Sequence, residues 1–147
     1  MVRIAVIIAA VALSGCVSFV PTYDNALYTD LSAVQTDVGK IHTTVQTVHD
    51  GPTTPFSSVE SYYTDAFTHL NDAMKIAKGQ VSYLRGKMAE KPAQDLQKSI
   101  ANCQQALTLT MNAFKMGPIS PAVESTFADN TACAAPSTME ALLKGNP

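Results

Sequence analysis

Apolar residues recur at helical spacing along most of this chain. Between residues 23 and 49 they alternate at intervals of four and three, which makes an unbroken heptad seam: Leu27, Leu31, Val34, Val38, Ile41, Val45 and Val48. Asp50-Gly51-Pro52 follows, where glycine suits the position after a helix and proline blocks its continuation. The pattern predicts one long helix over residues 23–49.

A second helical pattern runs from residue 57 to residue 90. Ser57 and Glu60 have the spacing of a capping box. The main apolar stripe comprises Val59, Tyr63, Ala66, Phe67, Leu70, Met74, Ala77, Val81, Leu84 and Met88, and a second row comprises Tyr62, His69, Ile76 and Tyr83. Two apolar rows indicate two neighbours, so this helix is expected at the centre of the fold. Gly79 and Gly86 predict a close approach of backbones beside the second row.

A third helical pattern spans residues 93–116, between Pro92 and Gly117-Pro118. Its stripe is Leu96, Ile100, Cys103, Leu107, Met111 and Phe114. In the tail, residues 120–128 are expected to form a short helix, and Ser137 with Glu140 forms a second capping-box motif. The chain is therefore predicted to be all-α, an antiparallel three-helix bundle with a partly helical C-terminal tail.

The heptad seam of residues 23–49 permits two arrangements. Valine and isoleucine at these positions suit an intermolecular coiled coil as well as a bundle. The matching stripes of the second and third helices favour packing within one chain. Self-association through residues 23–49 stays open as the alternative.

The first sixteen residues carry a different pattern. Arg3 precedes an uncharged apolar run of ten residues, Ile4 to Leu13, and the run leads into Leu13-Ser14-Gly15-Cys16. This resembles the signal peptide and lipobox of bacterial lipoproteins. The resemblance implies cleavage before Cys16 and fatty acyl chains, palmitate among them, on that cysteine.

The resemblance divides the chain into a signal peptide (1–15), a lipidated cysteine with a short tether (16–22) and a helical bundle domain (23–147). An uncleaved membrane anchor is the alternative, because residues 4–20 carry no charge, although small polar residues weaken the second half of that run. In Gram-negative members an aspartate after the cysteine often means retention at the inner membrane. This chain has Val17 there, which implies a lipid anchor in the outer membrane, facing the periplasm.

Charge and cysteine content narrow the partners. Loss of Arg3 would leave nine of the ten basic residues beside twelve acidic ones, a net charge of about −3, so nucleic acid is not an expected partner. Cys103 and Cys133 remain after Cys16 is used. In an oxidising periplasm the pair is most simply a disulfide that straps the tail over the third helix, with two buried free thiols as the alternative.

The histidines do not form a metal-site pattern. His42 and His49 are seven residues apart, about 10.5 Å along a helix, whereas zinc–nitrogen bonds are about 2.0–2.1 Å. His69 could join only one of them. No metal or cofactor is expected, and no catalytic residue is assigned, because no nucleophile elbow, zinc-protease motif, phosphate loop or close carboxylate pair occurs.

The second helix is predicted to carry Lys75, Lys78 and Arg85, and Lys78 and Arg85 flank its apolar stripe on one side. Such side chains normally lay their stems along the edge of the core and keep their charge in water. With a short tether they could also face anionic lipid headgroups.

The sequence thus predicts a non-catalytic binding or assembly module held at a membrane by its acyl anchor, with an envelope protein as partner. A phage- or plasmid-type exclusion lipoprotein that blocks a surface receptor is one alternative. A small-ligand carrier or an enzyme is the other.

Overall fold

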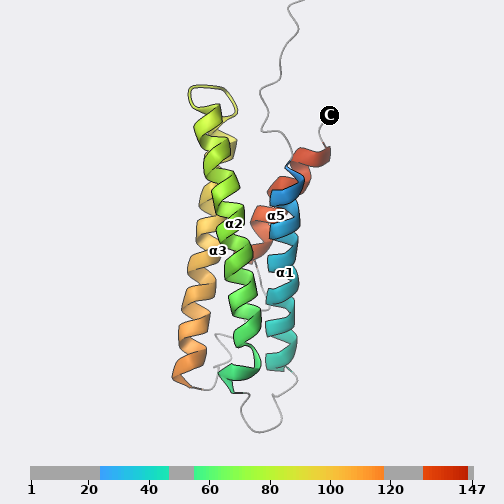
Figure 1. Cartoon of the computed structure of the whole chain (residues 1–147), viewed down its shortest axis with the longest axis vertical. Coiled ribbons are helices and arrows are strands. Elements are labelled where there is room, and N and C mark those ends of the chain that lie inside the picture. The colour runs from blue at the N-terminus through green and yellow to red at the C-terminus, as the bar shows by residue number, and fades with distance from the viewer. Residues whose placement is uncertain (1–23, 47–54, 118–130, 146–147) are drawn as a thin grey trace, which may run out of the picture.

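The computed structural model describes residues 24–46, 55–117 and 131–145, and helices dominate these residues (Figure 1). Three long helices, α1 (Asn25–Gln46), α2 (Glu60–Leu84) and α3 (Glu90–Met116), run antiparallel, and the short 3-10 helix η1 (Phe56–Ser58) precedes α2. A further helix, α5 (Thr131–Gly145), packs against α3 and α1. The predicted fold class, a three-helix bundle with a disulfide-strapped helical tail, is confirmed.

The heptad seam of α1 is buried inside the single chain. Five of its positions are at most 2% exposed: Leu27, Leu31, Val34, Val38 and Ile41. Val45 is partly buried against the same cluster. Val48 lies outside the described residues. The seam packs within the chain, as the matching stripes predicted.

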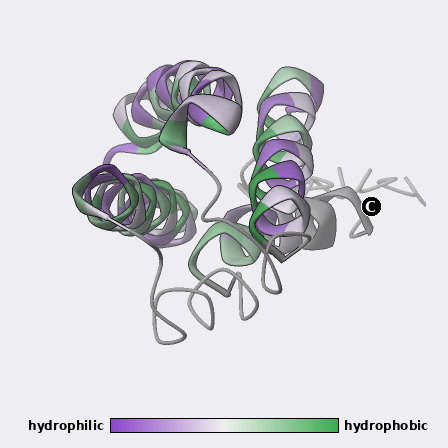
Figure 2. Cartoon of the chain, turned by 90° about the horizontal axis from the view of Figure 1, so that it is seen from below, coloured by the Kyte–Doolittle hydropathy of each residue, from purple (hydrophilic) through white to green (hydrophobic). Residues whose placement is uncertain are grey.

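α2 is the central helix and contacts both α1 and α3, as its two apolar rows predicted. Three alanines on its buried face, Ala66, Ala73 and Ala77, are fully buried, which lets both neighbours approach closely. The close backbone approach predicted at Gly79 and Gly86 is wrong, because a Cβ atom built at either residue would meet nothing within 4 Å. Figure 2 shows, from below, how hydrophobic and hydrophilic segments alternate around the helices.

Aromatic side chains close the end of the bundle where α2 begins. Phe56 lies 5.8 Å from the rings of both Tyr63 and Phe114, the latter edge-to-face. The capping box predicted at Ser57 is not formed. Ser57 belongs to η1, Val59 stands at the N-cap of α2, and no side chain caps it. Phe56, partly buried against the core, packs at this entry, where no polar side chain caps the helix.

At the other end, the predicted helix boundaries are wrong. α2 ends at Leu84 rather than Glu90, and α3 begins at Glu90, so Pro92 lies in the first turn of α3, where its missing N–H costs no helical hydrogen bond. Met88, expected in the apolar stripe of the second helix, is 94% exposed. α3 ends at Met116 before Gly117, as predicted.

The tail also differs from the expectation. α5 begins at Thr131, six residues before Ser137, and contains Pro136. Ser137 is therefore not an N-cap, and its hydroxyl donates to the carbonyl of Ala134 (2.9 Å). One face of α5 buries Cys133, Pro136 and Glu140, and this packing outweighs the helix-breaking tendency of the proline. The short helix expected at residues 120–128 lies outside the described residues.

Within the described ranges, no helix is long and apolar enough to cross a membrane.

Candidate functional site

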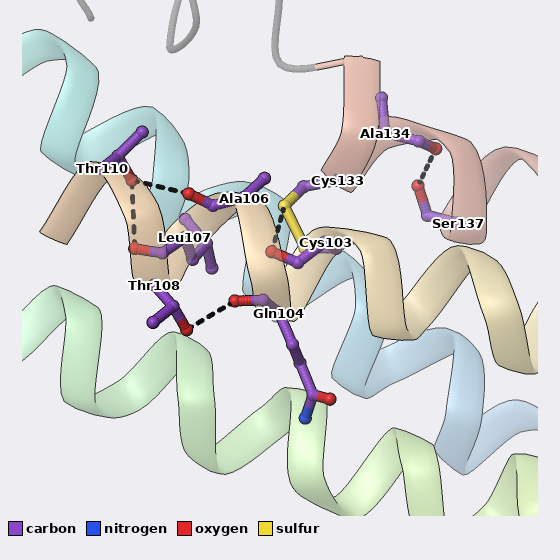
Figure 3. Close-up of a disulfide and its surroundings, with 9 residues drawn as sticks. All are labelled: Cys103, Gln104, Ala106, Leu107, Thr108, Thr110, Cys133, Ala134 and Ser137. Atoms are coloured by element: carbon purple, nitrogen blue, oxygen red, sulfur yellow. Dashed lines mark hydrogen bonds between the residues drawn. A yellow bond between two sulfur atoms is a disulfide. The ribbon is translucent and has the colours of Figure 1, made fainter. Parts of the chain in front are cut away.

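Two links hold α5 on the bundle, and the first is the predicted disulfide. Cys103, in the middle of α3, is bonded to Cys133 near the start of α5, with 2.05 Å between the sulfur atoms (Figure 3). Both residues are buried in the main core. Around the bond, Thr108 and Thr110 donate their hydroxyl hydrogens to carbonyls of the preceding turn of α3, so their polar groups are satisfied locally.

The second link joins α5 to the residue at which the chain enters α1. Glu140 is fully buried, and its Oε1 accepts the backbone N–H of Asp24 at 2.8 Å. The Asp24 carboxylate in turn accepts the N–H groups of Ala26 (2.9 Å) and Leu27 (3.1 Å), so Asp24 is the N-cap of α1. The start of α1 is thereby fastened to α5.

The electrostatics of Glu140 follow from its burial. Burial raises the pKa of its carboxyl group, the hydrogen bond from the Asp24 backbone lowers it, and the nearby Asp24 charge raises it further. Its other oxygen, Oε2, is buried and has no hydrogen-bond partner among the described residues. Burial is the largest of these effects, so the pKa of Glu140 lies above the ordinary value of a glutamate.

The turn between α2 and α3 is closed by a backbone hydrogen bond and braced by a second one to a side chain. The N–H of Lys87 donates to the carbonyl of Leu84 (2.8 Å), while Arg85 has φ −51° and ψ 126°, and Gly86 has φ +74°. These are the values of a type II turn, whose third position favours glycine. The N–H of Gly86 also donates to Glu90 Oε2 at 2.6 Å. Leu84, Ala89 and Ala93 form a small buried cluster of their own beneath the turn.

This turn and its flanks (residues 83–91) are named here the hairpin tip. Tyr83 is 75% exposed, and Lys87 places its ammonium group 3.8 Å from the centre of the Tyr83 ring. Lys91 forms an ion pair with Asp95. The apolar period did not indicate this arrangement, because it continues past Leu84 to Met88 as in an uninterrupted helix. The spacing of Gly86 and Pro92 was the available signal, since glycine follows helices and proline begins them.

The three basic residues singled out from the sequence are spread along α2 and the turn after it and do not form one cluster. Lys75 and Lys78 are exposed on α2, and Arg85 is exposed in the turn beyond it. The Asp72 carboxylate, 2.7 Å from the Lys75 ammonium, raises the pKa of that lysine and offsets its charge. Of the three, only Arg85 lies within the hairpin tip, residues 83–91.

The hairpin tip projects beyond the start of α1. His69 Nδ1 lies 3.1 Å from Asp30 Oδ1, and this fixes the register of the two antiparallel helices. Counting back from Asp30, α1 begins level with about residue 74 of α2, which leaves about ten residues, or roughly 10–15 Å, to the tip. Figure 1 shows the α2–α3 hairpin rising past α1, at the end of the bundle where α1 begins.

The histidines do not come together with other ligands. His69 pairs with Asp30, and His42 lies on α1. The structurally described ranges hold no group of three or more histidine, cysteine or acidic side chains that could bind a metal ion. His49 falls outside them, as do Cys16 and the tether of residues 16–22.

Comparisons of the chain with models of protein families, with curated proteins and with solved structures give no match.

Proposed function

We propose that this chain is a lipid-anchored envelope protein whose helical bundle serves as a non-catalytic binding or assembly module. The observation that carries the proposal is the motif Leu13-Ser14-Gly15-Cys16 behind an uncharged apolar run. Three acyl chains on Cys16 would bind the protein to the membrane permanently, because one chain alone gives marginal binding and each buried CH₂ adds about 0.8 kcal/mol.

The structure supports a body that stays close to such an anchor. Eight residues separate Cys16 from Asn25, where α1 begins. Fully extended, the nine Cα–Cα steps from Cys16 to Asn25 span at most about 32 Å. The first described residue, Asp24, is held by Glu140 and caps α1, so the tether would join the bundle at a fixed point.

The buried polar groups support a binding role over a catalytic one. Asp24 and Glu140 fasten two helices together, and Tyr63 donates its hydroxyl hydrogen to Thr110 inside the core (3.4 Å). Glu140 Oε1, the Asp24 N–H and the Tyr63 hydroxyl group are thus used in holding the helices together, whereas Glu140 Oε2 has no partner among the described residues. We propose that a second envelope protein binds the outer surface of the bundle from the periplasm.

Mass spectrometry of the protein purified from envelopes tests the anchor. We expect an N-terminus at an acylated Cys16, and we expect Cys16→Ser to remove the acyl chains while Ser18→Ala, two residues further on, keeps them. A full-length, unacylated N-terminus in the native protein would remove the basis of the proposal.

Cross-linking in intact envelopes tests the binding role. We expect a reproducible cross-linked partner protein with the native chain and less of it with Cys16→Ser. A partner that is a surface receptor would favour the receptor-blocking alternative. Enzymatic turnover by the purified chain with no partner would contradict the non-catalytic role.

A further inference from the structure

We propose that the hairpin tip is a second membrane contact, which seats Tyr83 and Met88 in the interface of a bilayer and pairs its basic side chains with anionic phospholipid headgroups. The inference rests on the proposed function for the distance between the bundle and the membrane. It goes further by naming a face of the protein and the chemistry of the surface that this face binds.

Exposed apolar side chains mark the tip. Met88 is 94% exposed and Tyr83 is 75% exposed, and four residues separate them across the turn. Tyrosine is enriched where membranes meet water, because its ring is apolar and its hydroxyl group is polar. A bilayer surface would take both side chains out of water without unfolding any part of the bundle.

The charge of the tip is opposite to that of the chain. The hairpin tip carries three basic side chains, Arg85, Lys87 and Lys91, against one acidic side chain, Glu90, whereas the whole chain has a net charge of −2. Glu90 accepts the N–H of Gly86, and Lys91 pairs with Asp95 just beyond the tip. An anionic surface would therefore attract this end of the protein and repel the remainder.

Position favours a bilayer over an acidic protein as the occupant. The tip lies at the end of the bundle where α1 begins and projects roughly 10–15 Å beyond that point. The eight-residue connection between Cys16 and Asn25 spans at most about 32 Å. The tip can therefore reach the plane in which the acyl chains of Cys16 would lie.

The tip is also organised before it binds. Its type II turn is closed by the Lys87–Leu84 hydrogen bond, and Glu90 holds the N–H of Gly86. Lys87 rests on the Tyr83 ring, which places a cation and an aromatic side chain at the same point. Little further ordering is needed for the contact to form.

Because the chain contains no tryptophan, a single introduced tryptophan reports on its own position alone. We would place it at Met88, and, as the matched control, at Met116, which is 85% exposed at the far end of α3. The acylated full chain is reconstituted into vesicles of phosphatidylglycerol and phosphatidylethanolamine, with and without brominated acyl chains. Circular dichroism confirms that both variants keep native helicity.

We expect the emission of Met88→Trp to shift to shorter wavelength and to be quenched by brominated lipid, while Met116→Trp stays unshifted and unquenched. Equal behaviour of the two variants would overturn the inference. So would a blue shift of Met88→Trp without quenching, because the tip would then be covered by protein, such as a second copy of the chain.

Charge variants sharpen the test. In the Met88→Trp background, Arg85→Gln and Lys87→Gln should each lower the ratio of bound to unbound tip about five-fold on anionic vesicles. Lys115→Gln, at the opposite end of the bundle, should leave the ratio unchanged. Unchanged ratios for Arg85→Gln and Lys87→Gln would overturn the headgroup contact.

Failure of this inference can be told from failure of the anchor. Acylated Cys16 in the same samples, seen by mass spectrometry, together with an unquenched Met88→Trp, overturns the tip contact and leaves the proposed function standing. An unacylated chain whose tip is still quenched on excess anionic vesicles removes the anchor and supports the tip contact.

Discussion

Removal of the Cys103–Cys133 cross-link should destabilise the bundle by a predictable amount. The bond closes a loop with a sequence separation of 30 residues. In the chain-entropy model, a loop of this length restricts the unfolded chain enough to stabilise the folded state by about 3.6 kcal/mol at 25 °C. That is a large fraction of the roughly 5–15 kcal/mol by which small domains are stable.

Urea unfolding followed by far-ultraviolet circular dichroism measures this effect. We compare oxidised protein, reduced protein and the double variant Cys103→Ala, Cys133→Ala. With an m-value of about 2 kcal/mol/M, the midpoint should fall by about 2 M on reduction. The double variant should fall somewhat further, because both sulfur atoms leave a buried cluster.

Two results would refute this reasoning. Midpoints of oxidised and reduced protein within about 0.3 M would mean that packing of α5, rather than loop closure, holds the tail. Loss of helical signal on reduction, before any urea is added, would mean that the bond creates α5 instead of restricting the unfolded chain.

Three further predictions concern individual residues. Burial raises the pKa of Glu140 above its ordinary value of 4.5, so the folded state holds that proton more tightly and stability falls as pH rises through the folded-state pKa. The amide oxygen of Glu140→Gln still accepts the Asp24 N–H, so in urea this variant should be more stable than the native chain at pH 7 and no more stable at pH 4. Burial likewise raises the pKa of Tyr63 to about 12 from 10, so the native chain should lose about 1.4 kcal/mol per pH unit between pH 10 and 12 relative to Tyr63→Phe, and parallel alkaline curves would contradict this. Gly86→Ala should destabilise the protein by about 1 kcal/mol, because Gly86 has a positive φ. Gly79→Ala should stabilise it by about 0.5–1 kcal/mol, because Gly79 is an exposed helical residue with free space around it. Urea midpoints of the two variants that move in the same direction would contradict this prediction.

The helices were predictable because the core selects them. Each long helix buries a stripe of apolar residues with a period close to 3.6, and that stripe is visible in the sequence whatever its partner is. The seam from Leu27 to Ile41 and the stripe from Leu96 to Phe114 are buried as the spacing indicated, apart from Met111, which is partly buried. Cys103 falls on the second stripe, which is why its inward position could be inferred.

Helix ends were less predictable because the energies that fix them are small and compete. Around the hairpin tip, continuing α2 from Leu84 to Glu90 would have kept the apolar period but placed Gly86 inside a helix, where glycine costs about 1 kcal/mol relative to alanine. A turn at Gly86 avoids this cost, leaves Pro92 in the first turn of α3 and leaves Met88 in solvent.

The hydrogen bond between Glu140 and the Asp24 backbone could not be predicted from the sequence. A glutamate three residues after Ser137 has the spacing of a capping box, and local pattern alone assigns it that role. Its actual partner, Asp24, is 116 residues away in the chain. Only the docking of α5 on α1 brings the two together.

The acyl anchor at Cys16 and the membrane contact of the hairpin tip would reinforce each other, which explains how a tip of low affinity can stay bound to the bilayer. A tip tethered within about 32 Å of the bilayer experiences an effective lipid concentration far above that seen by a free protein, so a contact of modest affinity stays formed. Two points of attachment, the start of α1 and the hairpin tip, also restrict how the bundle can lean. Both lie at one end, so the opposite end, with Phe56, Phe114 and Lys115, would point away from the membrane. An envelope partner would then meet that end or the flanks of the helices, and cross-links from the hairpin tip to a protein would be fewer than cross-links from α3 near Met116.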